Sequence, residues 1–170
     1  AIGETPGFEP GLFGQAAAFN GLDSFLFVED SRVFDALTDE MSVSVWVKDV
    51  GNIPDQGMIV MKRDRTIDNW SIHFMVSVST VRAVKFVYSG VGAPEPGYSV
   101  LQPVEEQQVW AVLCDGNWHH IAITHAFGVR NGTRLYLNGL ETPLEYIHYV
   151  GEHPAAVGSA SFQLSFGAVL

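Results

Sequence analysis

The chain has 170 residues, which is enough for one domain with a sizeable two-layer core. It carries 9 lysines and arginines against 19 aspartates and glutamates, a formal net charge of −10, which argues against a nucleic-acid groove because phosphate binding needs a basic footprint. Its apolar runs are all shorter than the roughly 18–20 residues that a membrane-spanning helix needs, so we expect no membrane insertion by this chain.

Alternation of apolar and polar residues predicts β-strands along most of the chain. The expected strands are Gln15–Phe19, Ser24–Val28, Met41–Lys48, Gly57–Lys62, Trp70–Val78, Val81–Tyr88, Gln107–Leu113, Trp118–His125, Thr133–Asn138 and Phe162–Gly167. In two of these strands the alternation is regular enough to assign faces. In Met41–Lys48, one face carries Met41, Val43, Val45 and Val47, and the opposite face carries Ser42, Ser44, Trp46 and Lys48. In Trp70–Val78, one face carries Trp70, Ile72, Phe74, Val76 and Val78, and the opposite face carries Ser71, His73, Met75 and Ser77. Such a period of two is typical of half-buried antiparallel strands.

Helical periodicity is weak throughout. The best helical candidate, Ser31–Glu40, is interpreted as a turn or a single helical turn between strands. Gly90–Pro103, with its prolines and glycines, is expected to be a flexible loop. We interpret it as a connector rather than as a binding loop. Many short strands without helices predict an all-β fold, an antiparallel two-sheet β-sandwich of the jelly-roll kind.

The strongest local pattern is a hairpin. The segment Asp115–Ile123 opens with an Asp-Gly turn, and Gly132–Gly139 forms the returning strand and ends in Asn-Gly. We predict that Trp118, Ile121, Ile123, Leu135 and Leu137 belong to this hairpin. Ile121 and Ile123 are expected to meet Leu135 or Leu137 across the sandwich core.

Three blocks in chain order resemble a known family. Gly14–Phe25 is similar to its opening "G-x-A-x-x-F-N-G-x-D-S-F", Met41–Lys48 to its "W-v-k" strand, and Trp118–Asn138 to its "W-H-H … L-Y-L-N-G" hairpin. The chain thus resembles laminin-G-like and pentraxin-like domains of the concanavalin A-type jelly rolls. The resemblance implies structural roles for the signature residues Trp46, Trp118, His119, His120, Asn138 and Gly139.

The resemblance also bears on the ends of the chain. We expect residues 1–170 to be a single domain that is part of, or excised from, a longer polypeptide. Relatives carry a further closing strand, so either the domain is cut short or a partner segment supplies that strand. Phe162–Val169 is therefore expected to lie beside a strand from elsewhere, because an unpaired apolar edge recruits other strands.

Calcium is the one cofactor that the sequence suggests. Lys62–Trp70 resembles the pentraxin "K-R-x-D-N-E" loop, which implies Asp68 and Asn69 as calcium ligands, with Asp64 as a further one. The competing interpretation is an ordinary Asx-turn before a strand.

The sequence predicts no enzyme. Retaining glycosidases need two carboxylates about 5–5.5 Å apart, whereas Glu105 and Glu106 are adjacent and would point to opposite faces, and Glu141 and Glu145 flank a proline-containing loop. Alternation places His119 and His125 on one face of a strand and His120 on the other, so they do not form a compact three-histidine site. Cys114, the single cysteine, is expected to be an inert thiol.

We therefore expect a non-catalytic recognition or adhesion module of a larger extracellular or cell-surface protein, binding a glycan or a protein through loops at the sandwich rim. Asn131-Gly132-Thr133 is an N-glycosylation acceptor sequence, with Asn131 in the hairpin loop. Two alternatives stay open: a structural assembly module completed by a strand from a partner, and a sandwich-fold glycosidase.

Overall fold

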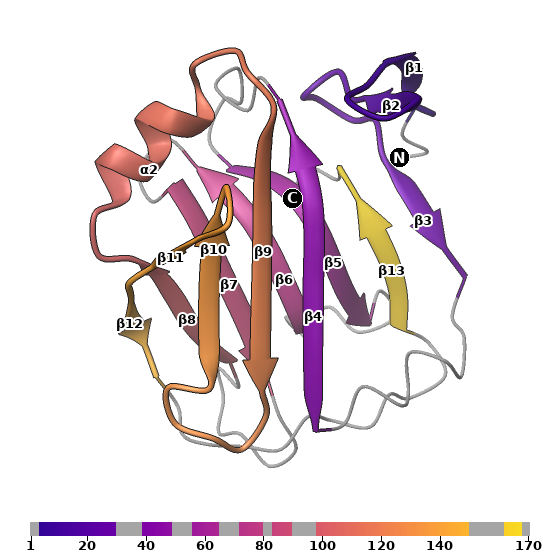
Figure 1. Cartoon of the computed structure of the whole chain (residues 1–170). Helices are drawn as coiled ribbons and strands as arrows, with labels where there is room; N and C mark the ends of the chain where they lie inside the picture. The colour runs from indigo at the N-terminus through magenta and orange to yellow at the C-terminus, as the bar shows by residue number, and fades with distance from the viewer. Residues whose placement is uncertain are drawn as a thin grey trace.

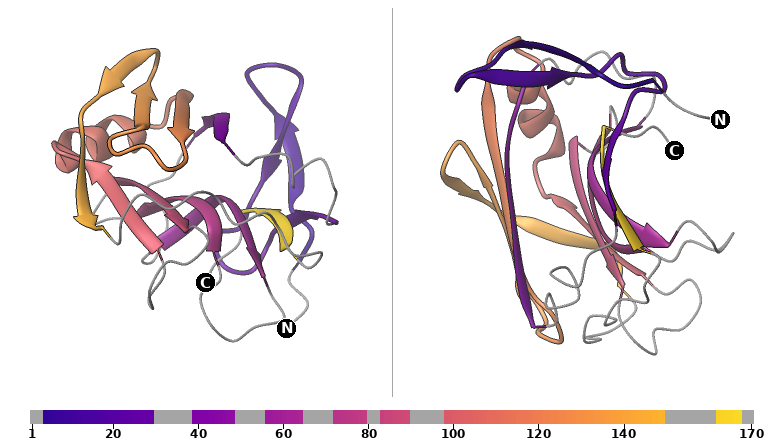
Figure 2. Two further views of the ribbon diagram at one scale, coloured as in Figure 1. Left: turned by 90° about the horizontal axis from the view of Figure 1, so that it is seen from below. Right: turned by 90° about the vertical axis from the view of Figure 1, so that its right-hand side faces the viewer.

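The computed structural model describes residues 4–29, 39–48, 56–64, 72–79, 83–89, 98–149 and 162–167. Within these residues the chain forms a seven-stranded sheet, a four-stranded sheet and a separate two-stranded hairpin, with all neighbouring strands antiparallel. The two larger sheets lie one in front of the other (Figures 1 and 2). The predicted antiparallel β-sandwich is confirmed.

The seven-stranded sheet forms the back layer in Figure 1. In spatial order its strands are β12 (Leu144–His148), β8 (Tyr98–Pro103), β7 (Ala83–Ser89), β6 (Ile72–Ser79), β5 (Gln56–Asp64), β13 (Phe162–Phe166) and β3 (Leu26–Val28). Sequential strands pair as neighbours from β5 to β8, whereas β13 comes from the far end of the chain.

The four-stranded sheet forms the front layer. Its strands, in spatial order, are β11 (Leu140–Thr142), β10 (Thr133–Leu137), β9 (His119–Ala126) and β4 (Glu40–Val47). The hairpin of β1 (Gly7–Pro10) and β2 (Gln15–Ala18) lies at the top right in Figure 1, near the end of β4.

The predicted pair of strands at residues 118–138 is confirmed as β9 and β10, although β9 begins one residue after Trp118. Ile123 lies opposite Leu135 and Ile121 opposite Leu137 in the register of the two strands. The expectation that these residues meet across the sandwich core is wrong, because they are side-by-side neighbours in one sheet.

Apolar side chains from both sheets fill the space between them. In β4 the burial alternates as predicted, with Met41 buried, Val43, Val45 and Val47 half-buried, and the serines and Trp46 exposed. These side chains pack with residues of both layers, including Val60, Phe74, Val76, Phe86, Leu101, Ile121, Ile123, Leu135 and Leu164. Lys62 of β5, in the seven-stranded sheet, is also buried. It lies opposite Phe74 of β6 and Leu164 of β13 in the strand register.

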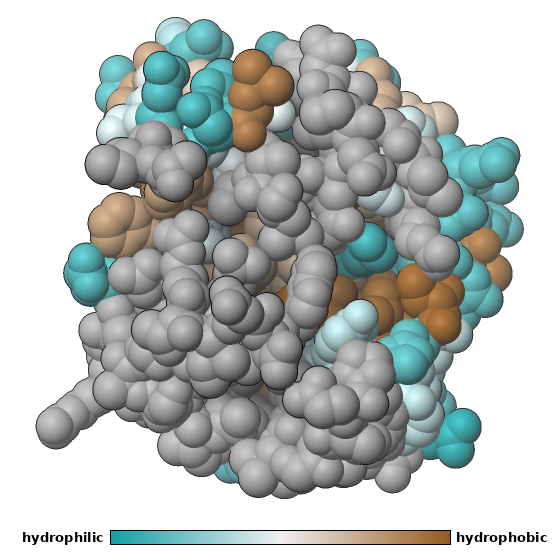
Figure 3. Space-filling view, turned by 180° about the vertical axis from the view of Figure 1, so that it is seen from behind, coloured by the Kyte–Doolittle hydropathy of each residue, from teal (hydrophilic) through white to brown (hydrophobic). Residues whose placement is uncertain are grey.

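The central strands of the seven-stranded sheet, β5 to β8, are buried on both faces, which the alternation in Trp70–Val78 did not predict. Met58, Met61, Met75, Val87 and Val100 form a second apolar cluster, and Ile72 packs in it. Ile72 was expected to share a face with Phe74, and this is wrong because the β5–β6 register shifts between Lys62 and Arg63. Figure 3 shows the molecule from behind, where brown apolar side chains reach the surface among the described residues.

Two local predictions are wrong. Gln107–Leu113 is part of a helix, α2 (Glu106–Leu113), because its two buried residues, Val109 and Leu113, are four apart and share a helix face. The last part of the expected loop Gly90–Pro103 is strand β8, almost entirely buried between β7 and β12. Of Ser31–Glu40, only Asp39 and Glu40 are described. Among the helices of the described residues, none is long and apolar enough to cross a membrane.

The C-terminal strand is not an open edge. In β13, Phe162–Phe166 pairs with β5 on one side, and Leu164–Phe166 pairs with β3 on the other. The expectation that this segment lies beside a strand from another source is therefore wrong for the residues of β13, because both of its neighbours come from this chain.

Candidate functional site

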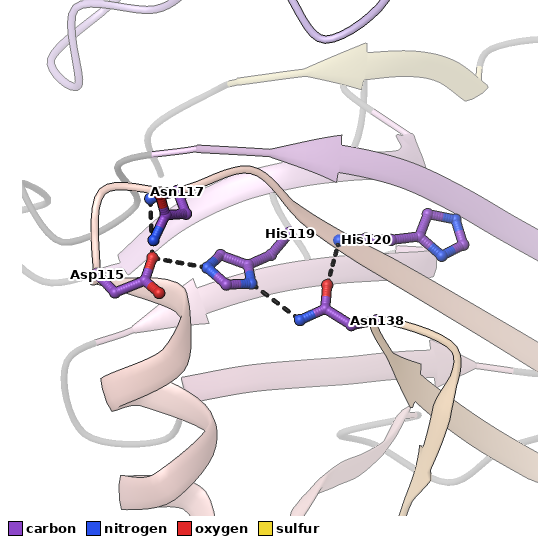
Figure 4. Close-up of polar contacts among 5 residues, drawn as sticks. All are labelled: Asp115, Asn117, His119, His120 and Asn138. Carbon is purple, nitrogen blue, oxygen red and sulfur yellow. Dashed lines mark hydrogen bonds and ion pairs between the residues drawn. The ribbon is translucent and has the colours of Figure 1, made fainter.

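A polar cluster joins the end of α2, the start of β9 and the β10–β11 turn (Figure 4). The chain leaves α2 through Asp115 and through Gly116, whose φ is 80°. Asp115 Oδ1 accepts a hydrogen bond from the Asn117 backbone N–H at 2.8 Å and lies 2.8 Å from His119 Nε2. The Asp-Gly turn thereby positions the Asp115 carboxylate next to the ring of His119, the first residue of β9.

Asn138 closes the other side of the cluster. It has a φ of 52° and Gly139 a φ of 82°, and they form the two-residue turn between the paired residues Leu137 and Leu140. Two positive φ angles are what a type I′ hairpin turn requires. The Asn138 side chain accepts a hydrogen bond from the His120 backbone N–H at 3.0 Å and lies 3.0 Å from His119 Nδ1.

These contacts select the tautomer of the neutral His119 ring. Because Asn138 Oδ1 accepts from the His120 N–H, its NH₂ group faces His119 Nδ1, which must then act as an acceptor. The proton of the neutral ring is consequently on Nε2, which donates to Asp115. This hydrogen bond, together with those from Asn117, lowers the pKa of Asp115 to about 2.

His119 therefore has a structural role. Both ring nitrogens have partners and the residue is only 6% exposed, so it offers neither a free base nor a free metal ligand. The predicted facing of the histidines is confirmed, because His119 and His125 are buried on the inner face of β9 and His120 lies on the outer face. Trp118 is half-buried just before β9.

His120 faces outward into a group of aromatic side chains. Its Nε2 lies 2.7 Å from Ser44 Oγ, and its ring centroid is 5.1 Å from that of Trp46, the opposite residue on β4. The Phe13 ring meets Trp46 edge-on at 6.1 Å. We call Phe13, Ser44, Trp46 and His120 the rim aromatic site.

The rim aromatic site is open to solvent. Trp46 is 43% exposed and Phe13 77% exposed. Phe13 is carried by the β1–β2 turn, which the Gly11 N–H closes by a 2.8 Å hydrogen bond to the Gly14 carbonyl. The outward direction of Trp46 and His120 follows from strand alternation, but nothing in the local sequence predicts that Phe13 would reach Trp46.

The remaining candidate residues do not gather at this site. Asp64 is the last residue of β5, and Asp68 and Asn69 lie outside the described residues. Within the part of the chain that the structure describes, no group of three or more His, Cys, Asp or Glu residues could hold a metal ion. Asn131 is exposed with a φ of 60°, whereas Thr133 of the acceptor sequence is buried.

The acidic candidates are separated in the fold. Glu105 and Glu106 lie at the start of α2. Glu141 on β11 pairs with Arg134 at 2.7 Å, and Glu145 on β12 accepts a hydrogen bond from Gln102 at 2.8 Å. Cys114 caps α2, and burial followed by the charge of Asp115 raises its pKa, which keeps the thiol protonated.

A laminin-G-like family model matches residues 20–143, a range that contains the polar cluster, Trp46 and His120. The chain belongs to the concanavalin A-like lectin/glucanase superfamily. No curated protein matches the chain in sequence.

Solved structures of this superfamily's fold match most of the chain. The binding domain of Paraclostridial Mosquitocidal Protein 1 is 11% identical with a TM-score of 0.56, and a chain of botulinum neurotoxin type C is 13% identical with a TM-score of 0.62; each covers 99% of this chain. The endo-β-1,4-glucuronan lyase of the fungus Trichoderma reesei is 13% identical with a TM-score of 0.50 and covers 85%. The chain spans only 42%, 38% and 61% of these three chains. At such low identity the likeness shows the fold alone.

Proposed function

We propose that this chain is a non-catalytic recognition module that binds a glycan through the rim aromatic site. The observation that carries the proposal is the exposed Trp46 ring, held between the rings of His120 and Phe13. Binding sites combine aromatic surface with a few placed polar groups, and Ser44 and His120 supply such groups here.

The polar cluster behind the site supports this role. Asn138 holds the His120 backbone, and Ser44 holds its ring, so the outer face of β9 is fixed before any ligand arrives. Such preorganisation lowers the entropy that binding must overcome. The botulinum neurotoxin type C structure adds support at the level of the fold, since cell entry of that toxin depends on interaction with two ganglioside molecules.

The enzyme alternative comes from the lyase that shares the fold. Against it, the Glu141 and Glu145 side chains each bind a neighbouring residue of their own sheet rather than each other. We further propose an extracellular or cell-surface location, for which the Asn131 acceptor sequence is the local support.

Binding to an array of neutral and sialylated oligosaccharides, followed by titration calorimetry with the best ligand, tests the proposal. Trp46→Ala and Phe13→Ala should each weaken binding by about tenfold, because an aromatic contact contributes roughly 0.5–1.5 kcal/mol beyond its buried area. Phe27→Ala is a matched control, since Phe27 is 51% exposed on β3, away from the site. Unchanged affinity in both site variants, or turnover of a bound polysaccharide, would contradict the proposal.

Calcium binding stays a prediction. If Asp68 and Asn69 hold the ion, millimolar calcium should raise the melting temperature, because a ligand that binds only the native state stabilises it by mass action. EDTA should reverse the rise and Asp68→Ala should abolish it. An Asx-turn without calcium predicts the same melting temperature in all conditions.

A further inference from the structure

The β1–β2 hairpin is joined to the sandwich less firmly than the other strands. Within the described part of the chain, β1 and β2 hydrogen-bond to each other and to no strand of either larger sheet. The two strands pack closely on each other, and neither packs extensively on another described element. All four residues of β1 are exposed. Because an isolated two-stranded hairpin is only marginally stable in water, this hairpin can move as a unit relative to the sheets.

The base of the hairpin is anchored to the back sheet. On one side, the Phe25 N–H, next to β3, donates to the Glu4 carbonyl at 3.2 Å. On the other side, the ring of Phe19, which follows β2, lies so close to the backbone of Gly167 that a methyl group there would clash with it. Both ends of the hairpin are thus held beside β3 and β13, and movement of the hairpin would be greatest at its tip.

The tip of the hairpin lies over the rim aromatic site. In the right-hand view of Figure 2, the indigo hairpin crosses the top of the sandwich, above the end of β4. The Phe13 ring at the tip meets the Trp46 ring at 6.1 Å with an interplanar angle of 72°. A single aromatic contact favours an equilibrium by only about two- to tenfold, so separation of these two rings is within the reach of thermal motion.

The distance between the two rings is too short for a sugar to enter. A ring held between two others needs two layers of carbon contacts of about 3.5–4.0 Å each, and therefore a separation of roughly 7–8 Å. The 6.1 Å between Phe13 and Trp46 is shorter than this, and the rings are close to perpendicular. Trp46 and His120 are fixed by the β4–β9 ladder. Phe13 is therefore the side that has to move.

We propose that the β1–β2 hairpin is a lid on the rim aromatic site, which opens to admit a sugar ring next to Trp46 and closes on it through Phe13. This inference rests on the proposed glycan-binding function and adds how access to the site is controlled. The platform of β4 and β9 stays in place while the hairpin moves. A lid makes both association and dissociation depend on hairpin motion, whereas a fixed wall makes association simply proportional to ligand concentration.

Motion of the lid is tested first without any ligand. In the whole chain, NMR relaxation dispersion of the Trp46 indole N–H, identified by its loss in Trp46→Phe, should show exchange on the microsecond-to-millisecond timescale. Phe13→Ala should abolish this exchange. Phe8→Ala is the matched control, since Phe8 is 59% exposed on the same hairpin, and should leave the exchange intact. A Trp46 signal without exchange, or exchange that persists in Phe13→Ala, would overturn the lid.

Binding kinetics then test the function of the lid. The probe is the oligosaccharide with the strongest signal on the array of neutral and sialylated oligosaccharides, followed by intrinsic tryptophan fluorescence in a stopped-flow instrument. The observed association rate should reach a plateau at high oligosaccharide concentration in the unaltered chain and in Phe8→Ala. In Phe13→Ala it should rise linearly, and dissociation should be about tenfold faster. A linear rise in the unaltered chain would overturn the lid.

The two proposals fail in different ways. An array on which no oligosaccharide binds would refute the glycan proposal and the role of the lid together. Binding that is lost in Trp46→Ala, but that shows no plateau and no exchange at Trp46, would leave the recognition site intact and overturn the lid alone. In that case Phe13 would be a fixed part of the site.

Discussion

Asn138 illustrates how a single side chain can hold a rim together. It combines a left-handed backbone with hydrogen bonds to two consecutive residues of the neighbouring strand, His119 and His120. Asparagine suits both tasks, because its short amide tolerates positive φ and offers a donor and an acceptor. The rim aromatic site therefore depends on a residue that does not belong to it.

Substitutions at Asn138 should separate these two tasks. Asn138→Gly keeps the backbone conformation and loses the hydrogen bonds, whereas Asn138→Ala also adds the cost of positive φ, roughly 1–2 kcal/mol. We expect the alanine variant to have the lower free energy of unfolding in urea. Equal stability of the two variants would show that the turn tolerates alanine and that the side-chain bonds carry the whole effect.

His125 is the residue whose burial should be visible in the pH dependence of stability. Its ring packs against Tyr88 at 4.2 Å and Phe127 at 4.5 Å, and burial lowers its pKa to about 4. Nδ1 lies 2.8 Å from Thr133 Oγ1, and Nε2 has no hydrogen-bond partner among the described residues. Protonation would place a charge in this apolar cluster, which is costly.

The sign of the effect follows from linkage. Between the ordinary value of 6.5 and about 4, the unfolded chain binds a proton at this position and the folded chain does not, so stability falls on acidification. Full separation of the two values corresponds to about 3 kcal/mol. Urea denaturation between pH 7 and pH 4.5 should therefore show a shallower pH slope for His125→Phe than for the unaltered chain. Parallel slopes would contradict the lowered pKa.

At the scale of the element, β9 is the strand on which the front sheet is built. It pairs with β4 on one side and β10 on the other, and Ile123 is 2% exposed between Val43 and Leu135. Ile123→Ala should lower the free energy of unfolding by about 2–4 kcal/mol through the cavity it leaves. Thr124→Ala, on the outer face of the same strand, is the control and should have a smaller effect. A similar loss for both would place Ile123 outside the core.

Sequence patterns predicted the strands of both sheets that carry clear alternation or a clear apolar run, including β4, β5, β6, β7 and β9, but missed several other elements. β4 and β9 alternate visibly because one side is covered and the other wet. β8 is buried on both sides and lay within an expected loop, and the apolar run in α2 resembled a strand. β1, β11 and β12 were not predicted. β11 and β12 have only 3 and 5 residues, with most of their side chains exposed or half-buried.

The candidate site, too, could be predicted from the sequence only in part. Alternation and the hairpin motif predicted that His120 faces outward, opposite the buried His119 and His125. The contact of Phe13 with Trp46 joins a hairpin turn to a distant strand, so no local pattern could predict it.

At the scale of the whole molecule, β13 closes the seven-stranded sheet. It inserts between β5 and β3, and β3 has no other sheet partner in the described residues. The side chains of Leu164 and Phe166 connect β13 to the core, where they pack against the main apolar cluster. A contact between such distant parts of the chain is entropically costly to form, so β13 must contribute substantial packing to be retained.

Truncation of the chain after residue 161 should therefore destabilise the N-terminal part of the molecule. Loss of β13 removes the backbone partners of β3, the buried side chain of Leu164 and the partly buried side chain of Phe166. An apolar side chain of this size contributes about 1.5–3 kcal/mol when fully buried. We expect a lower melting temperature and faster amide exchange in Leu26–Val28, while exchange in β9 and β10 changes least. Removal of residues 168–170 alone is the matched control, because it leaves all of β13 in place. Unchanged exchange in Leu26–Val28 after the longer truncation would show that β3 is held by something other than β13.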